Sequence, residues 1–266
     1  MKVTVITVAY NSSATIADTL TSVASQSHQN FEHLVIDGKS KDTTVQVVEA
    51  SLHPNLILTS APDSGIYDAM NKGLSRASGE VIGFLNSDDF YADATVLEKV
   101  AAAFQDVSVE ACFADLVYVT PDKSRVARYW KSKPFAKGDF AKGWCPAHPT
   151  FYIRKSALQR LGGFDQSFKL AADVEFMMRY LENGSVKSMY IPHVFVRMRL
   201  GGASNQSWGN VWKQNQEIFL ALKKNKVPFS VVGFWAHKVL SRAWQHVAAR
   251  FFRPKALDQQ AGRASS

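Results

Sequence analysis

The sequence predicts an α/β fold in which helices cover both faces of a mostly parallel sheet, with a smaller antiparallel element and a helical C-terminal segment. Two observations carry this prediction. Short apolar, β-branched runs alternate with helical segments over the first 105 residues, which is typical of parallel strands joined by right-handed crossovers. The run 81–85 is apolar throughout and then ends abruptly in polar residues, as expected of a strand that is buried on both faces.

The elements of the first half follow one another in a regular order. The polar segment 11–13 offers N-cap residues to a helix that ends at Ala24, and the later helices also begin after polar turns. The predicted strands are 3–8, 31–36, 56–58 and 81–85, and the further helices are 43–51, 65–75 and 94–104.

After residue 105 this alternation stops. Two predicted strands are joined by the turn Pro121-Asp122-Lys123, which favours an antiparallel pair. The predicted elements are strands 109–119, 125–130, 150–154 and 194–200 and a helix over 171–183. We therefore expect one domain over 1–205 with halves 1–105 and 106–205, a helical appendage over 206–254, and a disordered tail over 255–266.

The composition limits the classes of partner. The net charge of +8 and the pI near 9.4 suit nucleic acid, a membrane surface or a phosphorylated substrate. Nucleic acid is not expected, because the basic residues are spread out and no zinc-finger or RNA-binding signature is present. The two cysteines are far apart, the N-terminal run is too short for a signal peptide, and no apolar stretch could span a bilayer. We expect a cytoplasmic protein or one on the inner face of the cytoplasmic membrane.

Polar groups follow the predicted strands where these would meet, at the carboxyl edge of the sheet. Asp37 follows the second strand, where a carboxylate can accept a hydrogen bond from the imide N–H of uracil or from a ribose hydroxyl; the alternative role is to cap a turn. The other groups are Ala9, Tyr10 and Asn11 after the first strand, and the segment Asp63–Gly73, in which Asp68, Asn71 and Lys72 lie on one face of the helix 65–75.

The fourth group is Asn86-Ser87-Asp88-Asp89. Adjacent carboxylates repel each other unless a positive group joins them, and a divalent cation would do so while holding a phosphate-bearing substrate. The alternative is that these residues cap the following helix. The motif by itself leaves both interpretations open.

Four motifs are informative because of their order and spacing along the chain: Val5-Ile6-Thr7-Val8-Ala9-Tyr10-Asn11, Asp37-Gly38-x-Ser40-x-Asp42, Gly65-Ile66-Tyr67-Asp68-Ala69-Met70-Asn71-Lys72-Gly73 and Leu85-Asn86-Ser87-Asp88-Asp89. Together they resemble family 2 glycosyltransferases of the GT-A fold, in particular the bacterial branch that builds exopolysaccharide, colanic-acid-like or O-antigen units. The resemblance covers roughly residues 1–205. It implies a Rossmann-like nucleotide-binding half and an acceptor-binding second half.

The resemblance also implies roles for residues. Asp88 would bind Mn²⁺ or Mg²⁺ that bridges the donor phosphates, and Asp37 would contact the nucleobase. The donor-binding set would be Ala9, Tyr10, Asn11, Asp37, Asp68, Asn71, Lys72, Asn86 and Ser87. Two departures matter: Asn86 stands where the family often has the first acid of Asp-x-Asp, which would lower metal affinity, and lysines flank Ser40, where we expect them to face solvent.

A transfer to a sugar hydroxyl needs a carboxylate that takes the hydroxyl proton. The candidates are Asp165, Asp173 and Glu175. We choose Asp173, because it lies in the first turn of the predicted helix, where the helix dipole favours the ionised form, and because the resembled family has its general base at this position. Glu175 is the second choice, and Asp165 belongs to a turn.

Three further residues are candidates for binding the acceptor or the diphosphate. His148 stands between two prolines that fix its loop, although a lone histidine is usually structural. Arg197 and Arg199 precede Gly201-Gly202, and a basic loop there could close over the leaving diphosphate. The alternative is an ordinary surface loop.

The segment 208–253 carries apolar residues at helical spacing beside basic ones. Such a pattern suits either an interfacial helix on an anionic bilayer or a helix packed on the core. The apolar residues are Val232, Trp235, Val239, Trp244, Val247 and Phe251, and the basic ones are Lys238, Arg242, His246, Arg250 and Arg253.

The resemblance thus leads us to expect an inverting, metal-dependent glycosyltransferase that moves a sugar from a nucleotide-diphosphate sugar, UDP-linked in our expectation, to a sugar hydroxyl of a lipid-linked or polysaccharide acceptor. A polyprenyl-diphosphate carrier is the expected lipid. The alternative is a non-catalytic binding protein on a decayed transferase scaffold, which Asn86 favours and the retained Asp88 and Asp173 disfavour. No Gly-x-Gly-x-x-Gly follows the first strand, so an NAD-dependent enzyme is disfavoured.

Overall fold

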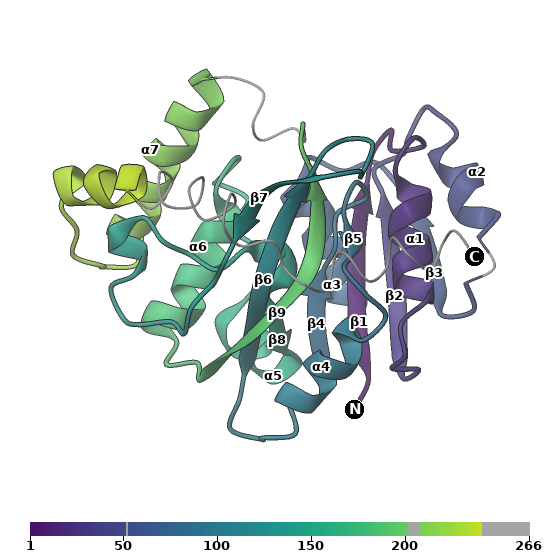
Figure 1. The fold of residues 1–266 in the computed structure, drawn as a ribbon, viewed down its shortest axis with the longest axis horizontal. Helices are drawn as coiled ribbons and strands as arrows, with labels where there is room; N and C mark the ends of the chain where they lie inside the picture. The colour runs from purple at the N-terminus through teal and green to yellow at the C-terminus, as the bar shows by residue number, and fades with distance from the viewer. Residues whose placement is uncertain (52, 202–207, 241–266) are drawn as a thin grey trace.

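The computed structural model describes residues 1–51, 53–201 and 208–240. Its centre is a nine-stranded sheet in the order β3-β2-β1-β4-β8-β6-β9-β5, with β7 paired to β6 (Figure 1). The strands are β1 Val3–Ala9, β2 Phe31–Asp37, β3 Leu56–Ser60, β4 Val81–Phe84, β5 Phe90–Tyr91, β6 Ala111–Val119, β7 Val126–Trp130, β8 Tyr152–Arg154 and β9 Ser188–Arg199. The α-helices are α1 Ile16–Ala24, α2 Thr44–Glu49, α3 Ile66–Arg76, α4 Val96–Ala103, α5 Lys155–Leu161, α6 Ala172–Met178 and α7 Trp208–Lys224.

The first half forms the parallel part of the sheet. Strand β1 pairs in parallel with β2 and with β4, and β2 pairs in parallel with β3. Every residue of β1 and β2 is buried, because helices cover both faces: α3, α5, α6 and α7 on one, α1, α2 and α4 on the other. The predicted α/β sandwich is confirmed, and the carboxyl ends of β1, β2 and β4 meet at one edge.

The second half extends the sheet with mixed strand directions. Strand β8 is antiparallel to both β4 and β6, and the predicted antiparallel pair is formed by β6 and β7. Gly83 of β4 lies directly under Tyr152 of β8, so that an added Cβ would stand 2.3 Å from the tyrosine ring. Glycine at this position therefore lets the two halves join closely.

Strand β9 is longer than the predicted strand 194–200 and begins at Ser188. Its parallel pairing with β6 is interrupted, since Ala114 pairs with Ile191 and Asp115 pairs with Val194. Pro192 lies in this irregular stretch, where it need not donate to the ladder. Because of this proline, the first part of β9 does not match a strand pattern and was not predicted. The two-residue β5 and the helix α5 were also not predicted.

The predicted helix 171–183 is α-helical only to Met178, and a π-helical turn follows over Arg179–Asn183. The Arg179 guanidinium donates to the carbonyl oxygens of Gly162 (3.1 Å) and Gly163 (2.6 Å). This ties the end of α6 to the segment that follows α5. At the other end of α6, the Glu217 carboxylate of α7 accepts the backbone N–H groups of Leu170 and Ala171.

The C-terminal segment packs on the core. Residues 231–240 are helical and are separated from α7 by the non-helical segment 225–230, and Phe234 of this helix is only 1% exposed. Its other side faces outward, with Val232 80% and Val239 63% exposed. The predicted positions Trp244, Val247, Phe251, Arg242, His246, Arg250 and Arg253 and the predicted tail lie outside the described residues. Within the described residues, no helix has the length and apolar character needed to cross a bilayer.

Candidate functional site

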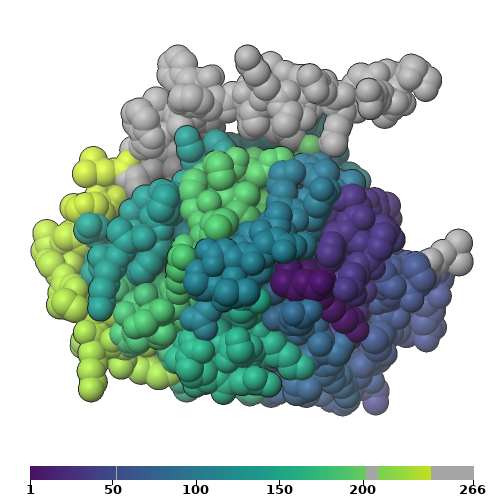
Figure 2. All heavy atoms as spheres, turned by 90° about the horizontal axis from the view of Figure 1, so that it is seen from below, coloured from purple at the N-terminus to yellow at the C-terminus, as the bar shows by residue number. Residues whose placement is uncertain are grey.

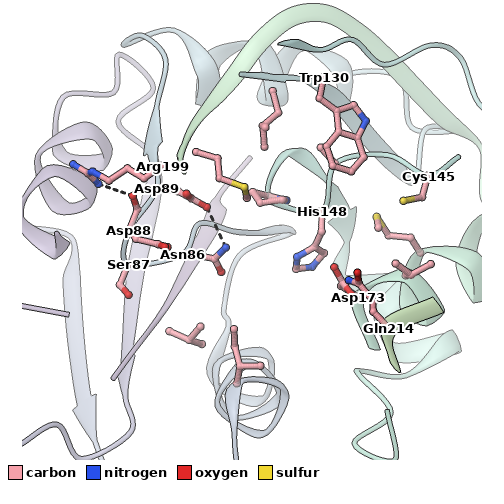
Figure 3. A pocket seen from close by; sticks show the side chains of 18 of the residues that line it. Asn86, Ser87, Asp88, Asp89, Trp130, Cys145, His148, Asp173, Arg199 and Gln214 are labelled. Atoms are coloured by element: carbon pink, nitrogen blue, oxygen red, sulfur yellow. Dashed lines mark hydrogen bonds between the residues drawn. The ribbon is translucent and has the colours of Figure 1, made fainter. Parts of the chain in front are cut away.

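One cavity of about 1020 Å³ lies between the two halves of the sheet and is lined by both. Figure 3 shows the Asn86–Asp89 loop on one side of it and His148 and Asp173 on the other. The loops that follow β1, β2 and β4 contribute to its lining, as expected for the carboxyl edge of parallel strands. Figure 2 views the molecule from below, where the first residues of the chain lie between later segments.

The end of β1 and the loop after it present Ala9, Tyr10 and Asn11 to the cavity. Asn11 has φ +50°, a left-handed conformation that asparagine tolerates better than most residues. Its backbone N–H donates to Ser40 Oγ (2.8 Å), and its Oδ1 accepts the backbone N–H of Lys41 (2.8 Å). These bonds hold the loop so that the Tyr10 ring, 56% exposed, lines the cavity.

The Asn86–Asp89 loop is tied from within and to the first loop. Ser87 Oγ lies 2.8 Å from Ser12 Oγ, and Asn86 Nδ2 donates to Asp89 Oδ2 (3.1 Å; Figure 3). Asp89 Oδ1 is buried with no hydrogen-bond partner among the described residues. Burial raises the pKa of Asp88, and burial together with the Asp88 charge raises the pKa of Asp89.

These residues fit a hard divalent cation. Their side chains supply oxygen ligands, and the buried Asp89 Oδ1, without a partner among the described residues, is an oxygen of the kind that such a cation binds. Among the described residues, no group of three or more acidic, histidine or cysteine side chains could hold a metal. Mg²⁺ is commonly held by one or two carboxylates together with substrate phosphates, so Asp88 and Asp89 suffice if a phosphorylated ligand completes the coordination.

Of the two predicted arginines of β9, only Arg199 lines the cavity. It donates to the Asp88 carbonyl oxygen (Figure 3). It also forms an ion pair with Asp18. Arg197 does not line the cavity; its Nε is buried without a partner among the described residues, and burial lowers its pKa. Arg199 therefore supports the Asp88 loop and adds positive charge beside it.

Asp173 and His148 line the opposite side of the cavity. Asp173 lies in the first turn of α6, and Tyr67 Oη donates to its Oδ1 (3.2 Å). The His148 ring stacks on Phe84 at 5.2 Å, and its buried Nε2 has no partner among the described residues. Burial lowers the pKa of His148, although the Asp173 charge acts in the other direction. A neutral imidazole thus lies beside an acid.

The other two candidate bases do not line the cavity. Glu175 is fully buried and forms ion pairs with Arg179 (3.2 Å) and Lys224 (2.8 Å). Asp165 also pairs with Lys224 (2.6 Å). The geometry therefore leaves Asp173 as the acid that a substrate in this cavity would meet on the α6 side.

Four of the predicted donor-binding residues lie outside the cavity lining. Asp37 is fully buried, and its carboxylate accepts hydrogen bonds from Ser40 and from Ser60 Oγ (2.6 Å). Asp68 pairs with Lys72 (2.8 Å). Asn71 binds both the N–H and the C=O of Phe164, each at 2.9 Å. In this structure these side chains hold loops and join the two halves.

Several residues that line the cavity were given no role in this site from the sequence. Asp63, which opens the third group expected at the sheet edge, approaches the loop after β2 so closely that a Cβ on Gly38 would stand 2.4 Å from its Oδ2. The Pro62-Asp63-Ser64-Gly65 turn was a usable signal, since it follows a strand and opens a helix. The other lining residues come from distant elements of the second half and of the C-terminal segment, so no local pattern brings them together: Arg128, Trp130, Trp144, Gln214, Phe234 and Lys238.

Known proteins are similar to this chain in sequence or in fold. A PGL/p-HBAD biosynthesis glycosyltransferase of Mycobacterium bovis (strain BCG / Pasteur 1173P2) is 28% identical over 201 residues, which are 73% of this chain and 76% of that protein. S. aureus TarS 1-349, solved in complex with UDP-GlcNAc, superposes with a TM-score of 0.65 at 22% identity, over 84% of this chain and 66% of that one.

The mannosyltransferase PcManGT of Pyrobaculum calidifontis, solved with GDP-Man and Mn²⁺, superposes with a TM-score of 0.63 at 19% identity, over 99% of this chain and 79% of that one. These likenesses confirm the predicted GT-A fold. The family model Glycosyl transferase family 2 matches residues 4–167, more than half of the chain. The chain belongs to glycosyl transferase family 2 and is a nucleotide-sugar-dependent glycosyltransferase.

Proposed function

We propose that this enzyme transfers a sugar, with inversion, from a UDP-linked donor to a sugar hydroxyl of a lipid-linked acceptor, with Mn²⁺ or Mg²⁺ at Asp88. One observation carries the proposal: a single cavity joins the Asp88–Asp89 pair to Asp173. The pair suits a cation and the donor diphosphate, and Asp173 suits an attacking hydroxyl. Among the described residues, Asp173 is the acid that lines the acceptor half, so direct displacement with inversion is the simplest chemistry.

Each part of the site has a proposed task. Asp88, supported by Asn86 and Asp89, holds the cation, which when bound neutralises charge on the departing diphosphate. Arg199 adds fixed positive charge next to that loop. Asp173 takes the proton of the acceptor hydroxyl, and His148, neutral and unpartnered at Nε2 among the described residues, hydrogen-bonds the acceptor beside it.

The donor base fits the exposed side of the first loops. The Tyr10 ring is available for stacking, and Asp63 lies at the same edge, next to Gly38. A carboxylate there can accept an N–H of the base, as uracil offers. The UDP-GlcNAc complex of TarS and the GDP-Man complex of PcManGT supply the two donor classes that a test must separate.

Calorimetric titration of the purified protein with UDP, GDP and dTDP, each with Mn²⁺ and with EDTA, tests this donor site. We expect metal-dependent binding of UDP, at least about tenfold tighter with Mn²⁺ than with EDTA, because a bridging cation offsets the repulsion between diphosphate and carboxylates. Equal binding with EDTA, or preference for another nucleotide, would contradict the metal or the UDP assignment respectively.

The acceptor proposal rests on the second half of the cavity. Trp130 and Trp144 line it with aromatic rings, and Lys238 brings a positive charge from the helix 231–240. The outer side of that helix exposes Val232, Val239 and Leu240, and Figure 1 places it next to α7 at one end of the molecule. We therefore include in the proposal that this outer side lies on an anionic bilayer, beside which a lipid-linked acceptor enters the cavity.

Vesicle sedimentation tests the membrane contact. We expect the protein to bind vesicles containing phosphatidylglycerol and the double variant Val232→Asp/Val239→Asp to bind about tenfold more weakly, because buried apolar area and anionic lipid drive such binding. Val107→Asp is the matched control, since Val107 is 86% exposed in the segment between α4 and β6. Equal binding by the double variant and the control would refute the assignment of this face.

A further inference from the structure

The Gly65–Gly73 motif contains a side chain, Tyr67, that contacts the proposed base in the opposite half of the molecule. Tyr67 lies in the first turn of α3, and its hydroxyl donates to Asp173 Oδ1 across 106 positions of sequence (3.2 Å). The more polar residues of the motif are used elsewhere, since Asp68 pairs with Lys72 and Asn71 holds the backbone of Phe164. Tyr67 is thus the member of the motif that touches the proposed base.

The tyrosine ring is held on a built aromatic platform. It stacks on Phe164 at 5.7 Å, and Phe164 stacks in turn on Phe176 at 4.5 Å. Phe176 lies three residues after Asp173 on α6, and Asn71 fixes the Phe164 backbone from the helix that carries Tyr67. The donor Oη and the acceptor Oδ1 are therefore positioned by the same packed unit.

The groups around Asp173 leave Tyr67 as the one that fixes its orientation. Burial raises the pKa of Cys145 to about 12 and lowers that of His148, so both are uncharged near neutral pH. Burial, then the Asp173 charge and, more weakly, Glu217 of α7 raise the pKa of Tyr67. Lys238 acts on Cys145 from the helix 231–240. Tyr67 keeps its proton and donates at every pH at which the enzyme would work.

We propose that Tyr67 is a positioning residue of the transfer step: its hydroxyl holds one oxygen of Asp173, so that the other oxygen faces the acceptor hydroxyl in the cavity. This inference rests on the proposed role of Asp173 as the base. A donated hydrogen bond also stabilises the ionised carboxylate, which is the form that can take a proton. The nucleotide half thereby sets the geometry of the base in the acceptor half.

The test compares Tyr67→Phe with Tyr180→Phe in the release of UDP from a UDP-sugar with alkyl glycosides as acceptors. Tyr180 is the matched control, because it is buried, packs on Phe176 at 4.5 Å and loses a hydroxyl that donates to Gly162 instead (2.6 Å). We expect Tyr67→Phe to lower kcat roughly 10- to 100-fold. The KM for the donor should stay within about twofold, because the donor diphosphate is held elsewhere.

The split between kcat and KM separates positioning from loss of structure. Tyr67→Phe should lose kcat while keeping the donor KM, whereas Tyr180→Phe should keep both. An unchanged kcat in Tyr67→Phe, or an equal loss in Tyr180→Phe, would overturn the inference. If Asp173→Asn were fully active, the proposed base would be wrong instead, and an inactive Asp173→Asn with an unaltered Tyr67→Phe would refute Tyr67 alone.

Discussion

Replacing Asp173 by asparagine should abolish most of the transfer activity while leaving the donor site intact. A positioned general base contributes about 10²- to 10⁴-fold in rate, and we expect kcat to fall by that factor. Asparagine keeps the size and the Oδ1 that accepts the Tyr67 hydroxyl, so the fold of α6 and the cavity should persist. What disappears is the ability to take a proton from the acceptor.

Two measurements on Asp173→Asn test whether Asp173 is the general base. Initial rates of UDP release give kcat, and calorimetry with UDP and Mn²⁺ should give an unchanged affinity, since Asp173 lies across the cavity from Asp88 (Figure 3). Asp165→Asn is the control, because Asp165 is the nearby acid that pairs with Lys224 outside the cavity lining. A normal rate in Asp173→Asn, or an equal loss in Asp165→Asn, would remove Asp173 from the role of base.

The sequence predicted the parallel half of the fold well because its signals are local. Strands 3–8 and 31–36 are rich in apolar and β-branched residues, and burial on both faces favours such runs. The second half was harder to predict. Pro192 interrupts the pattern of β9, and β5 has only two residues, so its pairing with Arg197 and Val196 leaves no periodic trace.

The residues of the site also fall into two groups, those that a local sequence signal predicts and those that depend on the tertiary structure. Tyr10, Asn86, Ser87 and Asp88 follow directly after strands, and their meeting at one edge follows from the topology. Asp37 is the last residue of β2, and Ser40 takes up its carboxylate, as the alternative role of capping a turn predicts. The second partner, Ser60, comes from β3, and no local pattern discloses that contact. The Tyr67–Asp173 contact depends on how the two halves of the domain pack against each other. No pattern in the sequence predicts that two residues so far apart along the chain come into contact.

Removing the Asp88 carboxylate should have the second large effect, this time on the donor side. We expect Asp88→Asn to lose the Mn²⁺-dependent part of UDP binding and to lower kcat by about 10³-fold or more, because a cation on the diphosphate is worth several kcal/mol to a departing phosphate. The contact of Arg199 is with the Asp88 backbone carbonyl, so the loop should keep its support. Calorimetry with Mn²⁺ and with EDTA, together with UDP release, measures both effects.

Because Asp89 is a second possible metal ligand, both the loss and the retention of metal-dependent binding in Asp88→Asn are informative. Asp89 Oδ1 is buried and unpartnered among the described residues, and Asn86 holds the other oxygen. If Asp88→Asn retained metal-dependent UDP binding, Asp89 would be the ligand, and Asp89→Asn should then abolish it. If Asp106→Asn, which removes an acid paired with Lys187 outside the cavity lining, weakened binding as much, the loss would reflect net charge rather than coordination. Metal dependence lost in Asp88→Asn and kept in Asp106→Asn would place the cation on the first carboxylate of the pair.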